Sequence, residues 1–105
     1  MIAQTPPPPY YAVIFTSVRK EGDDGYGNMA ARMEELAKQQ PGYLGFESAR
    51  EDIGITVSYW QSLDAIKNWK QNAEHLFAQQ YGREKWYKAY TTRICLVERD
   101  YSFQF

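Results

Sequence analysis

The chain has 105 residues, with 12 lysines and arginines against 13 aspartates and glutamates, and a formal net charge of −1. A chain of this length forms one domain and buries a limited share of its surface, so a second subunit would add useful core. The charge balance excludes a general nucleic-acid or membrane-surface binder, because such proteins carry a basic patch or a basic excess.

Residues 6–9 are four consecutive prolines, which fix φ and remove backbone donors. They predict an extended or polyproline II arm over residues 1–9, ahead of a single domain over residues 10–105. Whether this arm also serves as a ligand for a proline-recognition domain stays open. Residues 10–18 (YYAVIFTSV) are β-branched and aromatic, and they are apolar at both alternating parities. We therefore expect a strand that is covered on both faces.

Residues 20–27 contain three glycines and two aspartates, which predict a loop. Asn28 is the expected N-cap of a helix that runs to about Gln40. Pro41 and Gly42 then end this helix, since proline cannot continue it and glycine tolerates the turn. Its buried stripe, at helical spacing, comprises Met29, Met33, Leu36 and Ala37.

Two strands follow, over residues 43–50 and 53–60, and the turn between them is so short that they must be antiparallel neighbours. Ser62 is the expected cap of a second helix. The last and longest strand is expected over residues 87–98. If the second helix continues unbroken to Gly82, one side of it carries Ile66, Trp69, Ala73, Phe77 and Gln80.

The predicted order is β-α-β-β-α-β, which is the ferredoxin-like α+β arrangement. An antiparallel sheet that takes both helices on one face leaves its other face to be covered by something else. Neither parity of the first strand is polar enough to be left wet, because both alternating sets of side chains are apolar. We therefore predict a homodimer that packs sheet against sheet.

The chain has one cysteine, Cys95, and one histidine, His75. A single cysteine excludes an internal disulfide and a multi-cysteine metal site. One histidine beside one carboxylate, Glu74, lacks the ligands that zinc requires, so we expect no metal site. Cys95 falls in a strand pattern and is expected to be a small buried apolar residue.

No apolar run approaches the roughly 20 residues of a transmembrane helix. The first residues also lack the charged and apolar regions of a secretory signal. We therefore expect a cytoplasmic protein with no membrane partner.

Several features taken together resemble the antibiotic biosynthesis monooxygenase family. Residues 40–48 (QPGYLGFES) join the first helix to the second strand, a strand ends in Tyr59-Trp60, and a serine-capped helix carries Trp69. Trp86-Tyr87 then precedes the closing strand. The family consists of small dimeric α+β barrels, and the likeness covers residue 10 to about residue 101. The resemblance therefore implies a dimeric α/β barrel built from ferredoxin-like subunits.

The resemblance also implies a reaction. Family members that oxidise polycyclic aromatic compounds use the substrate's own electrons to activate oxygen, without a metal or a flavin. The chain would then be a cofactor-independent monooxygenase that oxidises a small aromatic ligand with O₂, in an apolar cavity between the helices and the sheet. The expected substrate-binding residues are Phe15, Trp60 and Trp69, and the candidate catalytic residues are His75 and Trp69. Each would shape the cavity or orient the substrate, and none is a nucleophile.

His75 and Trp69 also have simpler explanations. The pKa of a histidine lies near neutrality, which suits a proton shuttle or an axial ligand. On a continuous helix, however, His75 falls roughly opposite the apolar stripe and faces solvent, whereas a break near Asn72 would turn it inward. Trp69 lies on the apolar stripe and is equally explained as a core residue.

Two alternatives stay open. Family members that degrade haem use a helix tryptophan, a histidine ten residues later and an asparagine on the first strand. Trp69 matches, but the position ten residues later is Gln79, His75 comes only six residues later, and residues 10–18 contain no asparagine. Haem as a cofactor is thus the weaker alternative. The other is a non-catalytic dimer that binds a small ligand, so whether the chain is an enzyme stays open.

A locally basic stretch lies near the C-terminus. It is either a solvated face or a binding site for an anionic substrate group such as a carboxylate. The stretch consists of Arg83, Lys85, Lys88, Arg93 and Arg99.

Overall fold

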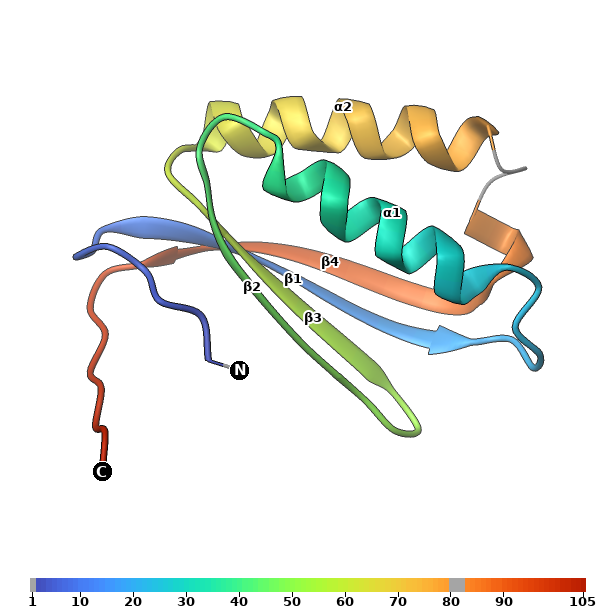
Figure 1. Ribbon diagram of the computed structural model, residues 1–105, viewed down its shortest axis with the longest axis horizontal. Helices are drawn as coiled ribbons and strands as arrows, with labels where there is room; N and C mark the ends of the chain where they lie inside the picture. Colours follow the sequence, from blue (N-terminus) through green and yellow to red (C-terminus); the bar gives the residue numbers. More distant parts are fainter. Residues whose placement is uncertain (1, 80–82) are drawn as a thin grey trace.

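The computed structural model describes residues 2–79 and 83–105. The strands form one antiparallel sheet in the order β2-β3-β1-β4, and both long helices lie on the same face of it (Figure 1). This is the predicted ferredoxin-like α+β arrangement. In chain order the elements are β1 (Tyr10–Arg19), α1 (Tyr26–Lys38), β2 (Tyr43–Arg50), β3 (Gly54–Trp60), α2 (Leu63–Gln79), the short 3-10 helix η1 (Arg83–Lys85) and β4 (Tyr87–Val97).

The start of α1 differs from the prediction. The N-cap is Gly25, which has a left-handed conformation with φ 85°, and Asn28 lies inside the helix. The carboxylate of Asp23 accepts hydrogen bonds from the backbone N–H groups of Gly25 (3.0 Å) and Gly27 (3.2 Å). The prediction that Asn28 caps this helix is therefore wrong, because an earlier acidic side chain already satisfies the first free amides.

The start and the course of α2 follow the sequence pattern. The hydroxyl of Ser62 accepts a hydrogen bond from the backbone N–H of Ala65 (3.1 Å), which confirms the predicted cap. The helix is continuous from Leu63 to Gln79, with no break near Asn72. Two predicted positions on this segment, Gln80 and Gly82, lie outside the described residues.

The core on the helix side of the sheet is divided into two clusters. The first surrounds Trp60 and contains Ala37, Ala65 and Ile66. The second surrounds Trp86 and contains Met29, Leu76 and Phe77. One cluster therefore lies near the start of α2 and the other near its end.

Each cluster is built on a tryptophan that is almost completely removed from solvent. Trp60 is 0% exposed and Trp86 is 1% exposed. Their indole N–H groups donate hydrogen bonds to the hydroxyl of Ser58 (2.8 Å) and to the carbonyl of Asp24 (3.0 Å), respectively. Both rings are thus buried without leaving an unpaired donor, which would cost stability.

The N-terminal arm lies over part of the opposite face of the sheet. The backbone N–H of Ala3 donates to one carboxylate oxygen of Glu47 (2.9 Å), and the hydroxyl of Tyr59 donates to the other (2.7 Å). The hydroxyl of Tyr10 on the same face donates to Asp100, where the C-terminal tail leaves the sheet (2.5 Å). Both chain ends therefore contact this face, and the C-terminal tail then extends away from the sheet (Figure 1).

Much of the remaining sheet surface is uncovered in a single chain. On the face away from the helices, Ile55 is 41% exposed and Cys95 is exposed. The prediction that Cys95 is buried is therefore wrong, because no described segment packs over this part of β4. On the helix side, Tyr90, Ile94 and Leu96 of β4 are 45%, 52% and 49% exposed.

Neither α1 nor α2, in the part of the chain that the structure describes, combines the length and the apolar character needed to cross a bilayer.

Gly42 connects α1 to β2 and provides a test of the packing between this turn and α2. It has φ 84°, and a Cβ atom there would lie 2.6 Å from the Cβ of Ala65. We expect Gly42→Ala to lower the free energy of unfolding by about 2–4 kcal/mol, from left-handed strain and from overpacking together.

Gly22 is the matched control for this substitution. It has φ 83°, and a Cβ atom there would meet nothing within 4 Å. Gly22→Ala should cost only the left-handed strain, about 1–2 kcal/mol. Urea denaturation of both variants measures the difference, and equal losses would contradict the packing argument.

Glu47 provides a pH-dependent test of the face away from the helices. Hydrogen bonds from the Tyr59 hydroxyl and the Ala3 amide hold the pKa of Glu47 below its usual range. A lowered pKa stabilises the folded state above the unfolded value of about 4.3, and this stabilisation is lost as the pH falls through the folded pKa.

We therefore expect the wild type to have a higher melting temperature than Glu47→Gln at pH 7. This difference in melting temperature should shrink as the pH falls from about 5 to about 3. Thermal unfolding followed by circular dichroism at a series of pH values measures this gap. A gap that does not change with pH would show that the charge of Glu47 contributes nothing.

Candidate functional site

A cavity of about 450 Å³ lies between the sheet and the two helices. Its volume falls within the range of small-molecule binding sites. Most of its wall is apolar or aromatic, from Val13, Phe15, Tyr26, Met29, Ala30, Met33, Ala37, Phe46, Ile66, Trp69, Ala73, Phe77, Tyr87, Tyr90 and Ile94. The polar part of its lining is Glu34, Thr56, Ser58, Lys70, Glu74, Arg83 and Thr92.

The position of the cavity follows from the divided core. Ala37 and Ile66 belong to the Trp60 cluster, whereas Met29 and Phe77 belong to the Trp86 cluster, and all four also line the cavity. The helices thus contact the sheet through these two clusters, and the space between the clusters stays open. Ala73, which projects from α2 into this interval, has too little volume to fill it.

Two of the three predicted substrate-binding residues lie on the cavity wall. Phe15 contributes from β1 and Trp69 from α2. Trp60 does not line the cavity; its ring is stacked on that of Trp69, with centroids 5.8 Å apart and an interplanar angle of 20°. Trp60 therefore supports Trp69 from behind, which limits the orientations that the Trp69 ring can adopt.

His75 is exposed and lies outside this cavity. It contributes instead to a shallow groove between the two helices, together with residues such as Arg32, Leu36 and Asn72. This position agrees with the continuous helix, which turns His75 away from the side that carries Trp69.

An ion pair between Arg83 and Glu74 forms one polar part of the wall. The two guanidinium Nη atoms donate to the two carboxylate oxygens over 2.6 and 2.7 Å, a bidentate arrangement. The hydrogen bond from Arg83 lowers the pKa of Glu74, and burial only partly opposes it. The guanidinium carbon also lies 4.2 Å from the ring centroid of Phe77 and 5.4 Å from that of Tyr90.

Two phenols form another polar part of the wall. The hydroxyl of Tyr87 donates to that of Tyr26 over 3.5 Å, and the rings meet edge to face with centroids 5.8 Å apart. Burial raises the pKa of Tyr87, and the hydrogen bond to Tyr26 adds to this effect. Tyr87 is therefore a neutral hydrogen-bonding group at physiological pH.

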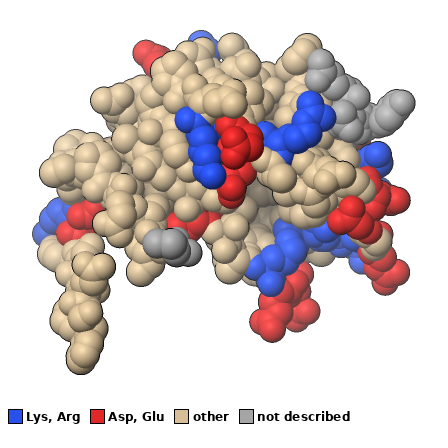
Figure 2. Space-filling model, in the orientation of Figure 1, with Lys and Arg blue, Asp and Glu red and all other residues tan. Residues whose placement is uncertain are grey.

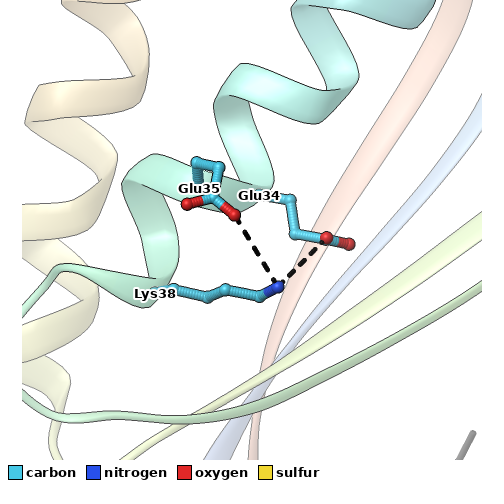
Figure 3. A network of polar contacts seen from close by, with 3 residues as sticks. All are labelled: Glu34, Glu35 and Lys38. Atoms are coloured by element: carbon cyan, nitrogen blue, oxygen red, sulfur yellow. Dashed lines mark hydrogen bonds and ion pairs between the residues drawn. The ribbon is translucent and has the colours of Figure 1, made fainter.

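Glu34 lies at the edge of the cavity on α1. Figure 3 shows Lys38 reaching toward both Glu34 and Glu35, with distances of 3.3 and 4.0 Å. The hydrogen bond to Glu34 raises the pKa of Lys38.

On the face of the molecule that Figure 2 shows, charges of both signs are distributed with no large area of one sign.

Sequence reasoning identified part of this lining for other reasons. Met29 and Met33 were expected as the buried stripe of α1, and Arg83 as a member of a basic stretch. Nothing in the sequence marked Tyr26 or Tyr87 as a cavity residue, because a tyrosine in a loop or at a strand end predicts nothing about the surface that it faces. Among the described residues, no group of three or more histidine, cysteine, aspartate or glutamate side chains is placed to hold a metal ion.

Comparison with known proteins places the chain in a family. The family model described as antibiotic biosynthesis monooxygenase matches residues 9–81. The uncharacterized protein YqjZ of Bacillus subtilis (strain 168) is 53% identical over 105 residues, which cover 98% of this chain and 92% of that protein.

Solved structures show the same fold at low sequence identity. SnoaB, a cofactor-independent oxygenase from Streptomyces nogalater, is similar with a TM-score of 0.66 at 12% identity, covering 90% of this chain and 97% of that chain. A conserved protein from Methanosarcina mazei Go1 is similar with a TM-score of 0.68 at 11% identity, covering 88% of this chain and 94% of that chain. The chain belongs to the antibiotic biosynthesis monooxygenase family.

Proposed function

We propose that this protein is a cofactor-independent monooxygenase that oxidises a small aromatic compound with O₂ in the cavity between the helices and the sheet. The observation that carries this proposal is the cavity of about 450 Å³, whose wall is mainly aromatic and aliphatic with a few polar groups. Such a wall matches the flat apolar faces of a fused-ring substrate. Family membership supports the reaction class, and the fold shared with SnoaB is consistent with it.

An anthrone-type substrate makes the proposed chemistry concrete. Its CH₂ group becomes a carbonyl, one oxygen atom of O₂ enters the product, and the other leaves as water with the two hydrogens. The electrons come from the substrate after it loses a proton to form an electron-rich enolate. The protein must therefore bind the rings, favour the anion and keep water away from the reacting carbon.

The wall offers groups for each of these tasks. Trp69, held by its stack on Trp60, and Phe15 would bind the faces of the rings. The charge of Arg83 is paired with Glu74, but its buried Nε–H has no hydrogen-bond partner among the described residues and would donate to the substrate oxygen. The hydroxyls of Tyr26 and Tyr87 would donate or accept hydrogen bonds at the ring substituents.

His75 has no place in this proposal. It lies in the groove between the helices and does not line the cavity, so a proton would have to cross α2 to reach it. The same position removes support from a haem-degrading reaction, in which a histidine near Trp69 would bind the iron.

We also infer that the protein functions as a homodimer, with the sheet of one chain packed against that of a second copy. The accessible surface of the single chain is 7518 Å², whereas a compact monomer of 12.3 kDa exposes about 6,100 Å². The additional surface includes apolar side chains, with Ile55 41% exposed on the uncovered face of the sheet. The C-terminal tail adds Tyr101 and Phe103, each 86% exposed. A second copy would remove such surface from water.

The first test asks whether turnover depends on the cavity. Met33 lies on the cavity wall, and Met33→Trp would fill part of the space that a substrate needs. We expect the wild type to accelerate oxygen uptake with anthrone or a related electron-rich phenol above the rate without protein. Met33→Trp should lower this rate by about a hundredfold, because a displaced substrate loses its reactive geometry.

Arg32→Trp is the matched control, since Arg32 is the exposed neighbour of Met33 and does not line this cavity. It should keep the wild-type rate. Oxygen-electrode traces and circular dichroism of all three proteins provide the measurement. The proposal fails if the wild type is inactive across a broad phenol panel, or if Met33→Trp retains full activity.

The second test concerns assembly. Ile55→Asp places a charge on the uncovered face of the sheet, where desolvation on dimer formation would be costly. We expect sedimentation analysis to show a dimer for the wild type and a shift to monomer for Ile55→Asp. Leu63→Asp, which changes a residue 54% exposed at the start of α2, should leave the dimer intact. A wild type that sediments as a monomer at micromolar concentration would refute the inference.

A further inference from the structure

Two arginines lie beside Tyr26, near the polar part of the cavity wall that Tyr26 and Tyr87 form. The guanidinium carbon of Arg19 is 3.5 Å from the ring centroid of Tyr26, and that of Arg50 is 5.9 Å from the same centroid. Arg19 comes from the end of β1 and Arg50 from the end of β2. The fold therefore brings two positive charges from distant parts of the sequence to one phenol ring.

These two charges are balanced by no carboxylate among the contacts of the described residues. Arg19 donates to the carbonyls of Trp86 (3.2 Å) and Gly22 (2.9 Å), and Arg50 donates to the hydroxyl of Ser17. A guanidinium group has five N–H donors, so each arginine has donors beyond those that these bonds use.

Among the described residues, no acidic side chain of the loop after β1 or of the turn between β2 and β3 forms an ion pair with Arg19 or Arg50. The carboxylate of Asp23 accepts from backbone amides at the start of α1. Glu51 and Asp52 follow Arg50 in the turn between β2 and β3, but the ion pairs found among the described residues involve Lys38 and Arg83 only. Arg19 is half-buried and Arg50 is exposed, and an anion that approaches the Tyr26 ring would be attracted by both charges.

Gly54 allows Arg50 to occupy this position. It lies on β3 directly opposite Arg50 and Ser17 on the neighbouring strands. A Cβ atom at residue 54 would overlap the guanidinium group of Arg50. The arginine side chain can therefore lie across the sheet only because residue 54 has no side chain. Since the obstructed group is the end of a flexible side chain, an alanine here would displace the arginine at little cost to the fold.

We propose that Arg19 and Arg50, together with the hydroxyls of Tyr26 and Tyr87, bind the carboxylate of an aromatic ligand whose rings occupy the cavity. Tyr26 and Tyr87 line the cavity, and Arg19 and Arg50 lie against Tyr26 just outside that lining. A carboxylate that extends from the ring system to the two phenol hydroxyls would therefore lie next to both cations. A bidentate pair with a guanidinium group is among the strongest hydrogen-bonded contacts that side chains offer a carboxylate. The inference rests on the proposed function, because it assigns an acidic substituent to the substrate of the same cavity.

The test uses 2-naphthoate and its neutral isostere 2-naphthamide, whose binding is followed by isothermal titration under nitrogen. We expect the wild type to bind 2-naphthoate more tightly than 2-naphthamide. Arg50→Met and Gly54→Ala should each weaken 2-naphthoate binding by about ten- to a hundredfold and leave 2-naphthamide binding unchanged. Arg32→Met removes the same charge from the exposed side of α1 and should change neither affinity.

Equal affinities of the two probes in the wild type would overturn the inference. So would an equal loss for both probes in Arg50→Met, or no binding of either probe. Circular dichroism of each variant shows whether it is folded, and Gly54→Ala moves Arg50 without deleting it. Because no oxygen is present and naphthoate is not oxidised, these results are independent of the oxygen-uptake test. A protein that turns over neutral phenols but ignores 2-naphthoate would keep the proposed function and lose the carboxylate site.

Discussion

The burial of two tryptophans, Trp60 at the end of β3 and Trp86 just before β4, is the constraint on which the rest of the structure depends. Each fills the space between the sheet and the helices at a different position along α2, and each pairs its indole N–H inside the protein. Between them Ala73 of α2 is too small to fill the interval, so the helices are held above the sheet with an open space. Rigid packing at two positions thus gives both a stable layer and a cavity of defined shape.

The positive charges at and near the cavity differ in whether a carboxylate balances them. Arg83 is neutralised by the bidentate contact with Glu74. Arg19 and Arg50 lie behind the phenols of Tyr26 and Tyr87 without such a partner among the described residues. A ligand with one acidic substituent would therefore bind most tightly with that substituent at the phenols. This preference would fix the orientation of the ligand in the apolar cavity. This asymmetry comes from strand register, because Arg50, Gly54 and Ser17 are cross-strand neighbours.

Some sequence predictions failed because the surroundings of a residue in the folded chain outweighed the local sequence pattern around it. Asn28 has the chemistry of a cap, but the carboxylate of Asp23 reaches the free amides first. Cys95 has the pattern of a buried strand residue, but β4 lies at the edge of the sheet and no described segment covers it. Trp60 was expected on the cavity wall and instead lies behind Trp69, since stacking of the two rings leaves only one of them facing the interior.

The sequence by itself determined the order of the elements, the face of each helix that is buried and the cap of α2, because periodicity and capping act between residues close together in the chain. It also carried enough of the family pattern to predict the fold and the cavity. Only the tertiary structure decided that Trp60 supports Trp69, that His75 lies outside the cavity, and that Arg19 and Arg50 meet at Tyr26. These relations depend on strand register and on the distance between the layers, which are properties of the assembled sheet and helices.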